Sequence, residues 1–311
     1  MPRLATKIRG SGIRRHAQLG VALISGALLV ACGGAPASQF PDAAHVIGRM
    51  REALSCSRGV QVEAKADYFE ASRRVRGNLA VISSLPDNVR IDVYSPFGLN
   101  LSTLTSNGKD FSLYELQSRK YWWGNASACN LSRFTRVSLP PFVLGQLLRG
   151  EAPVLKHEPS QAALTWSKSW FGSGHYEIEI RGANQSTEKI ELVPASEDWS
   201  LPWHLQRLHV TNVTVWQAGT KLYEVMLEGH APAHTAAPRS DPDGLDPPLM
   251  PSGPPCSADV PRRIRFISPT SDTDFVLGYT RVEHNPPLVP GVFTQPVPGG
   301  VQAIHSQCAD E

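Results

Sequence analysis

Hydrophobic and polar residues alternate along most of this chain, with the period of two that is typical of β-strands burying one face. The alternating segments occupy residues 60–69, 75–83, 89–94, 99–105 and 111–117, which an aromatic stretch at 121–123 follows, then 162–168, 175–181, 189–194, 205–216 and 222–228, and finally 263–268 and 275–283. Asn107-Gly108 lies between two of these segments and favours the tight turn of a β-hairpin. The pattern predicts a predominantly antiparallel sheet.

Two segments show helical spacing instead. Hydrophobic residues recur at intervals of three and four after Asp42, which predicts a helix over residues 42–54 with that aspartate as its cap. A second helix is predicted from a Ser138 cap to Gly150, with Pro140 near the first turn. Residues 231–261 contain nine prolines and are expected to form an irregular insertion near the end of the sheet. We therefore expect a single α+β domain over residues 42–311.

The composition excludes two classes of protein. No hydrophobic run reaches the roughly 18–20 residues that a membrane-spanning helix needs, so the chain is not a multi-pass membrane protein. With 30 Lys+Arg against 28 Asp+Glu, the net charge of +2 is far from that of a nucleic-acid-binding protein. The first 31 residues hold five basic residues and no acidic one, so the remainder has 25 basic and 28 acidic residues and a net charge of −3.

Those 31 residues have the layout of a signal peptide. A basic stretch to Arg15 is followed by a hydrophobic stretch over residues 19–31 and then by Cys32. Residues 29–32, Leu-Val-Ala-Cys, resemble the bacterial lipobox, in which the cysteine thiol receives diacylglycerol and the chain is cut before it. We therefore predict lipidation at Cys32, a tether over residues 32–41, and anchoring by several acyl chains. Gly33 and Gly34 replace the aspartate that retains lipoproteins in the inner membrane of well-studied systems, which favours the periplasmic face of the outer membrane.

Four cysteines remain after lipidation: Cys56, Cys129, Cys256 and Cys308. An even number in an oxidising compartment indicates two disulfides, and four cysteines allow three pairings. The pairing Cys56–Cys129 with Cys256–Cys308 keeps each bridge within one half of the chain and is the one we favour. No pair has the CxxC spacing of a redox or zinc site.

The sequence offers little catalytic chemistry. It has no G-x-S-x-G, no H-E-x-x-H, no phosphate-binding glycine loop and no dinucleotide fingerprint. His230 and His234 are four residues apart, but Pro232 prevents a regular helix from aligning them on a metal. We therefore expect no enzyme activity, no metal and no cofactor.

One turn carries an unusual residue. Pro96-Phe97-Gly98 lies between two alternating segments, so a large aromatic side chain occupies a turn where polar residues are usual. Burial of such a ring contributes about 1.5–3 kcal/mol, so either Phe97 folds back onto the sheet or it protrudes to meet a hydrophobic partner.

The order of these segments resembles the LolA/LolB family of lipoprotein carriers and receptors. An early helix precedes a strand with Arg76-Gly77, a second strand runs into Ser95-Pro96-Phe97-Gly98, and residues 141–150 resemble the helix that follows the first half of the family's sheet. The resemblance implies a strongly curved, half-open antiparallel β-barrel closed by helices, which holds acyl chains. It also implies that Pro96, Phe97 and Gly98 form a loop contacting membrane or cargo, since the family's protruding leucine lies at the place of Phe97.

Candidate residues for an acyl pocket follow from the alternation and the second helix, although the same residues could simply fill a closed core. They are Val75, Leu79, Val81, Ile91, Val93, Leu99, Leu101, Leu113, Leu144, Leu147 and Leu148. The function expected is a non-catalytic lipid or lipoprotein carrier or receptor, whose partners are an acylated lipoprotein or lipid, the outer membrane and a periplasmic carrier protein. The alternative is a lipoprotein that uses the same curved sheet to bind a protein partner in envelope assembly or stress sensing.

Overall fold

The computed structural model describes residues 35–70, 73–135, 139–168 and 174–308. Its α-helices are α1 (Ala43–Ala53), α2 (Ala128–Thr135) and α3 (Pro141–Leu148), and its 3-10 turns are η1 (Pro159–Gln161), η2 (Ser196–Asp198), η3 (Trp203–Leu205) and η4 (Pro269–Ser271). Its strands are β1 (Gly59–Glu70), β2 (Arg73–Ser84), β3 (Asn88–Tyr94), β4 (Asn100–Asn107), β5 (Asp110–Glu115), β6 (Lys120–Asn125), β7 (Ala162–Ser167), β8 (His175–Arg181), β9 (Ser186–Pro194), β10 (Leu208–Gln217), β11 (Thr220–Glu228), β12 (Ala231–Pro232), β13 (His234–Thr235), β14 (Asp259–Val260), β15 (Arg263–Ser268), β16 (Thr273–His284) and β17 (Gln302–His305).

Nearly all the strands belong to one large sheet. Its order is β17-β6-β5-β4-β3-β2-β1-β16-β15-β11-β10-β9-β8-β7, and β13 pairs with β16 beside this path. All pairs on the path are antiparallel except β17 with β6. The alternating segments are confirmed as strands of an antiparallel sheet, with bounds that differ by a few residues.

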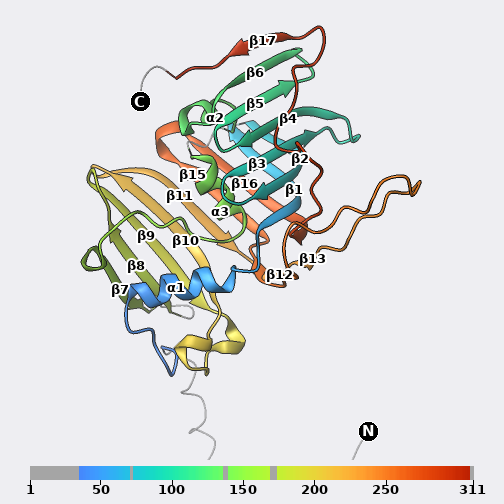
Figure 1. Cartoon of the computed structure of the whole chain (residues 1–311). Coiled ribbons are helices and arrows are strands. Elements are labelled where there is room, and N and C mark those ends of the chain that lie inside the picture. Colours follow the sequence, from blue (N-terminus) through green and yellow to red (C-terminus); the bar gives the residue numbers. More distant parts are fainter. Residues whose placement is uncertain (1–34, 71–72, 136–138, 169–173, 309–311) are drawn as a thin grey trace, which may run out of the picture.

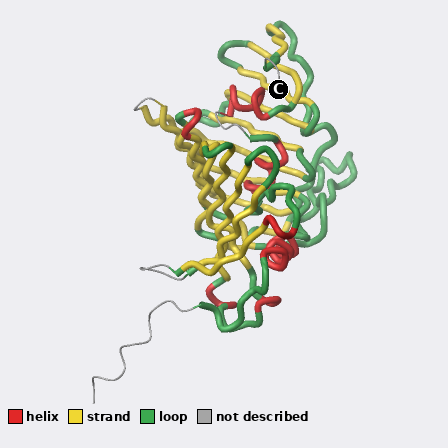
Figure 2. Tube along the Cα trace, turned by 90° about the vertical axis from the view of Figure 1, so that its left-hand side faces the viewer, coloured by secondary structure: helices red, strands yellow, loops and turns green. Residues whose placement is uncertain are grey.

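The sheet is open. In the described part of the chain its two outermost strands, β17 and β7, are not paired with each other. Figure 1 shows β7–β10 running in a different direction from β3–β6, as expected for a twisted sheet of many strands, and Figure 2 shows the twist from the side. The expected α+β class with few helices is therefore confirmed, whereas a strongly curved half-barrel is not.

Helix α1 lies across one end of the sheet, in contact with β7 and β10 (Figure 1). Asp42 is its N-cap, as predicted, and its side chain accepts a hydrogen bond from the backbone N–H of His45 at 3.0 Å. Val46, Ile47 and Met50 face the sheet and are fully or almost fully buried. The helix thereby covers the hydrophobic face of β7–β10 and fills that half of the core.

Helix α3 covers a different part of the same face and contacts β2 and β3. It begins at Pro141, with Pro140 as N-cap, and the predicted Ser138 cap lies outside the described residues. Gly150, with φ of +84°, follows the helix in the left-handed conformation that glycine adopts without strain. Helix α2 was not predicted from the sequence. Among the described residues no helix is both long enough and apolar enough to cross a membrane.

The Pro-rich residues 231–261 connect β11 to β15, two strands that pair directly. Their regular structure is limited to the two-residue strands β12, β13 and β14 and two isolated bridges, Arg239 with Leu249 and Pro251 with Pro287. Figure 1 shows part of this segment extending well away from the sheet. The segment is thus an excursion between neighbouring strands.

Two disulfides form, but the predicted pairing is wrong. The structure joins Cys56 to Cys256 and Cys129 to Cys308, over separations of 200 and 179 residues. The first bridge follows from the pairing of β1 with β16, and the second follows from the pairing of β17 with β6, because each pair brings distant segments of the chain together. Asn285, just after β16, donates side-chain hydrogen bonds to the backbone carbonyls of both Cys56 and Pro254. Proximity in sequence was therefore a poor guide to proximity in space.

Candidate functional site

A cavity of about 510 Å³ opens on the face of the sheet that α3 covers. Its floor is formed by β1–β5, β15 and β16, and α3 closes one side. Successive side chains of a strand point to opposite faces, so the lining residues recur at every second position. In β2 these are Val75, Gly77, Leu79 and Val81.

Cross-strand pairing continues this hydrophobic surface from strand to strand. Ile91 pairs with Val81 on one side and with Leu104 on the other, and Leu104 pairs in turn with Leu113. Val75 is 51 % exposed, so the cavity is open to solvent near the start of β2. The cavity therefore has a hydrophobic floor and is open to solvent on one side.

The cavity brings together nine of the eleven side chains predicted as pocket lining: Val75, Leu79, Val81, Ile91, Val93, Leu101, Leu113, Leu144 and Leu148. The other two lie elsewhere. Leu147 is fully buried in the main core and does not line the cavity. Leu99 is exposed in the turn before β4, where a bulge opposite Val93 and Tyr94 interrupts the alternation.

Part of the cavity lining comes from strands that are far apart in the sequence, and these residues were not predicted. Ala66 and Tyr68 of β1 and Phe266, Phe275 and Leu277 of β15 and β16 all line the cavity. Ala66 pairs with Gly77 on one side and with Leu277 on the other, so one strand joins the two walls. The alternation in each of these strands can be read from the sequence. The pairing of strands more than 200 residues apart cannot.

Phe97 protrudes at the mouth of this cavity. Its side chain is 97 % exposed, so it does not fold back onto the sheet. Ser95 holds the turn, because its hydroxyl accepts hydrogen bonds from the backbone N–H groups of Phe97 and Leu99. Gly98 has φ of +83°, a conformation that favours glycine. Ser95 and Pro96 line the cavity, so the exposed ring stands next to its mouth.

The few charged residues of the lining are paired. Arg76 donates to Asp67 at 2.9 Å on the rim, and Glu115 accepts a hydrogen bond from the Ser118 hydroxyl at 2.8 Å. Most of the remaining lining is aliphatic or aromatic. Ligand sites of this size are typically lined by apolar groups with a few polar groups at defined positions. The lining of this cavity therefore suits a hydrocarbon chain.

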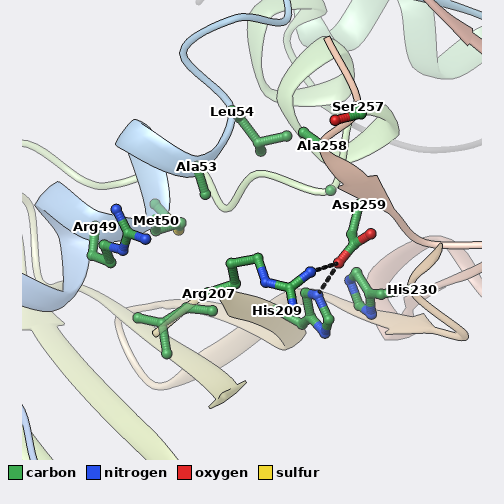
Figure 3. A pocket seen from close by; sticks show the side chains of 12 residues that line it. Arg49, Met50, Ala53, Leu54, Arg207, His209, His230, Ser257, Ala258 and Asp259 are labelled. Atoms are coloured by element: carbon green, nitrogen blue, oxygen red, sulfur yellow. Dashed lines mark hydrogen bonds and ion pairs between the residues drawn. The ribbon is translucent and has the colours of Figure 1, made fainter. Parts of the chain in front are cut away.

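A second, smaller cavity of about 100 Å³ lies between α1 and the start of β10 (Figure 3). Asp259 accepts a hydrogen bond from His209 Nε2 at 2.9 Å and lies 3.6 Å from Arg207. His230 stacks on His209 with ring centroids 4.6 Å apart. Burial lowers the pKa of His230 to about 3, so its imidazole is neutral at physiological pH.

These groups do not assemble a nucleophilic site. Figure 3 shows Ser257 well separated from both imidazoles, and no hydrogen bond joins them within the described part of the chain. A serine can act as a nucleophile only when a base is within hydrogen-bond reach. The cluster of His209, His230 and Asp259 therefore lacks the relay of a hydrolase.

One group of side chains on β8 and β9 has the composition of a metal site. His175, Glu177 and Glu191 bring ligand atoms within 4.8 Å of one another. However, the ammonium group of Lys189 lies 2.7 Å from Glu177 and 3.5 Å from Glu191. Lys189 thus already supplies a positive charge at the position that a cation would take.

The fold of this chain is similar to that of a solved structure, although its sequence is not. No protein-family model matches the sequence, and no curated protein is significantly similar to it. A DUF1329 family protein from Desulfovibrio piger is 11 % identical, with a TM-score of 0.51, over 80 % of this chain and 94 % of that one. This similarity shows a shared fold.

Two further solved structures are more distant. A LolA superfamily protein from Nitrosomonas europaea is 12 % identical with a TM-score of 0.47, over 82 % of this chain and 98 % of that one. A domain named as an outer membrane lipoprotein-sorting protein, from Vibrio parahaemolyticus, is 9 % identical with a TM-score of 0.46, over 79 % and 95 %. Both of these similarities are weaker than that of the first structure.

Proposed function

We propose that this protein binds acyl chains in the 510 Å³ cavity and acts as a lipid or lipoprotein carrier or receptor at the outer membrane. One observation carries the proposal: a largely apolar cavity open to solvent has a fully exposed aromatic ring, Phe97, at its mouth. Burying hydrocarbon there yields about 0.8 kcal/mol per methylene group.

A closed barrel is not required for this function. The twisted sheet, including β15 and β16, supplies a floor, and α3 supplies one wall. Phe97 would make the first contact with hydrocarbon, either of the cargo or of the membrane, before the chain enters the cavity. This contact would give the exposed ring a function, and it would offset the free energy that burial in the core would have contributed.

Native mass spectrometry of the gently purified protein tests the proposal. We expect a co-purified acylated molecule that leaves when the protein is denatured. A protein whose cavity is free of ligand, and which gains no mass when incubated with lipid, would contradict acyl binding. That result would favour the alternative, in which the sheet binds a protein partner.

The anchor is a separate part of the proposal. Cys32 lies outside the described residues, and the predicted tether is docked on the body from Pro36 onward, where Pro36 and Phe40 are buried. The backbone N–H of Trp203 also donates to the Ser38 hydroxyl at 3.0 Å. Only residues 32–35 then separate the lipid from the body, and a short tether would hold the protein close to the membrane.

Cys32→Ser removes the thiol that would be acylated, so the variant should incorporate no labelled fatty acid and should leave the outer-membrane fraction. Ala31→Gly, which keeps a small residue before the cysteine, serves as the control and should remain lipidated. Continued labelling and membrane fractionation of Cys32→Ser would contradict the anchor.

A further inference from the structure

The size of the cavity limits what it can hold. A methylene group is about the size of a water molecule, whose share of liquid volume is about 30 Å³. The cavity of about 510 Å³ therefore has room for roughly 17 methylene groups, which is one long acyl chain. Three such chains would need about 1,500 Å³ by the same measure.

We propose that the cavity takes a single acyl chain of about 16 carbons, so that its ligand is a monoacyl lipid. This inference rests on the proposed function and narrows its substrate class. A free fatty acid and a lysophospholipid share this chemistry, because each presents one hydrocarbon chain and one polar head.

The cavity has little room to grow along the sheet. Beyond α3 the same face is packed under α1, where Ile178, Ile190, Leu192 and Val213 are fully buried. A chain could extend under α1 only if this core separated, which would expose hydrophobic surface to water. The packed half of the sheet is therefore a boundary of the cavity.

Helix α3 separates the cavity from the half of the sheet that is packed under α1. Buried polar contacts at the end of α3 fix its position. The Tyr279 hydroxyl donates to the carbonyl of Leu148 at 3.1 Å. Arg149, which is almost fully buried, donates to the carbonyl of Ser57 at 2.8 Å and pairs with Glu151 at 2.6 Å. Moving this end of the helix would leave a buried charge and several polar groups without partners, which is costly.

Gly77 offers a way to reduce the cavity without disturbing the fold. It lies in the lining, its φ is not positive, and a Cβ built there meets only Val93 Cγ1, at 4.0 Å. Gly77→Leu would add four carbon atoms on the cavity side, and Gly77→Ala would add one. Gly48 on the exposed face of α1 is the matched control, because a Cβ there meets nothing within 4 Å.

The test is a chain-length series of binding measurements on the full chain carrying Cys32→Ser, so that no anchor chain competes for the cavity. Saturated fatty acids and lysophosphatidylcholines of 8 to 22 carbons are titrated separately by calorimetry. We expect one chain per protein and an affinity that rises roughly fourfold per methylene until about 16–18 carbons, then levels off as further methylenes remain at the open mouth. A stronger response in one series identifies the polar head.

In Gly77→Leu the plateau should move to chains about four carbons shorter, with a shift of about one carbon in Gly77→Ala and none in Gly48→Leu. Two or three chains bound per protein, or an unchanged plateau in folded Gly77→Leu, would overturn the single-chain inference while leaving acyl binding intact. Absence of binding at every chain length would instead overturn the proposed function and this inference with it.

Discussion

Phe97 is the most exposed large hydrophobic side chain in the described part of the protein. A substitution there can therefore change function while leaving the stability of the fold almost unchanged. Because the ring makes little contact with the core, Phe97→Glu should change the free energy of unfolding by no more than about 0.5 kcal/mol. A carboxylate at the mouth opposes entry into hydrocarbon, so liposome binding or acyl transfer should fall strongly. Thermal melts and a liposome-transfer assay on the same protein measure both effects.

Leu245→Glu is the matched control for Phe97→Glu, since Leu245 is 86 % exposed but lies in the Pro-rich insertion and outside the cavity lining. It should leave transfer unchanged. A large loss of melting temperature in Phe97→Glu would contradict the protruding ring, and normal transfer in both variants would contradict its role.

Glu188 is a buried carboxyl group that makes stability depend on pH. Its Oε2 accepts a hydrogen bond from the backbone N–H of Leu155 at 2.8 Å, while Oε1 has no partner within the described residues. Burial raises its pKa from 4.5 to about 8. Between those two values the unfolded chain releases a proton that the folded protein keeps, so stability falls as the pH rises.

Glu188→Gln removes this titration. Relative to wild type, the variant should gain on the order of 3 to 5 kcal/mol in unfolding free energy between pH 4 and pH 8. Urea denaturation of both proteins across that range measures the difference, in which the other titrating groups cancel. A difference that stays constant with pH would show that the carboxyl group has an ordinary pKa.

At the scale of elements, α1 is stabilised mainly by packing and is weakened by one residue of its own sequence. Gly48 lies in the interior of the helix on its exposed face, and a Cβ there has free space. Gly48→Ala should therefore stabilise the protein by about 0.5–1 kcal/mol, because alanine loses less backbone entropy in a helix. A chemical denaturation curve measures this, and a loss of stability would mean that the helix is not continuous through residue 48.

At the scale of the whole molecule, the two disulfides join segments that are 200 and 179 residues apart in the sequence. Peptide mapping without reduction should find Cys56 linked to Cys256 and Cys129 linked to Cys308, and denatured, unreduced protein should have no free thiol among these four. Replacing both cysteines of either pair by alanine should cost about 2–5 kcal/mol, because each bridge closes a very long loop. Recovery of a Cys56–Cys129 peptide would contradict the strand order that places β1 beside β16.

Local features of this protein could be predicted because they depend on residues close in sequence. The period of two sets which side chains of β2–β5 share a face, and so seven cavity residues on these strands could be named. Leu144 and Leu148 could be named from the predicted second helix. Asp42 caps α1 through a contact three residues away, and Ser95 holds the Phe97 turn through contacts two and four residues away. Such contacts need no knowledge of the rest of the fold.

What the sequence by itself determined is therefore the sheet-rich class, the capped first helix and the place of the Phe97 turn. That the ring protrudes was decided by the structure. Only the tertiary structure decided that β1 pairs with β16, which joins Cys56 to Cys256 and places Phe266, Phe275 and Leu277 opposite β2. Alternation gives the face of a strand but neither its partner nor what covers it. Whether a hydrophobic face is filled or left open depends on where α1 and α3 dock, and packing across the whole molecule sets that.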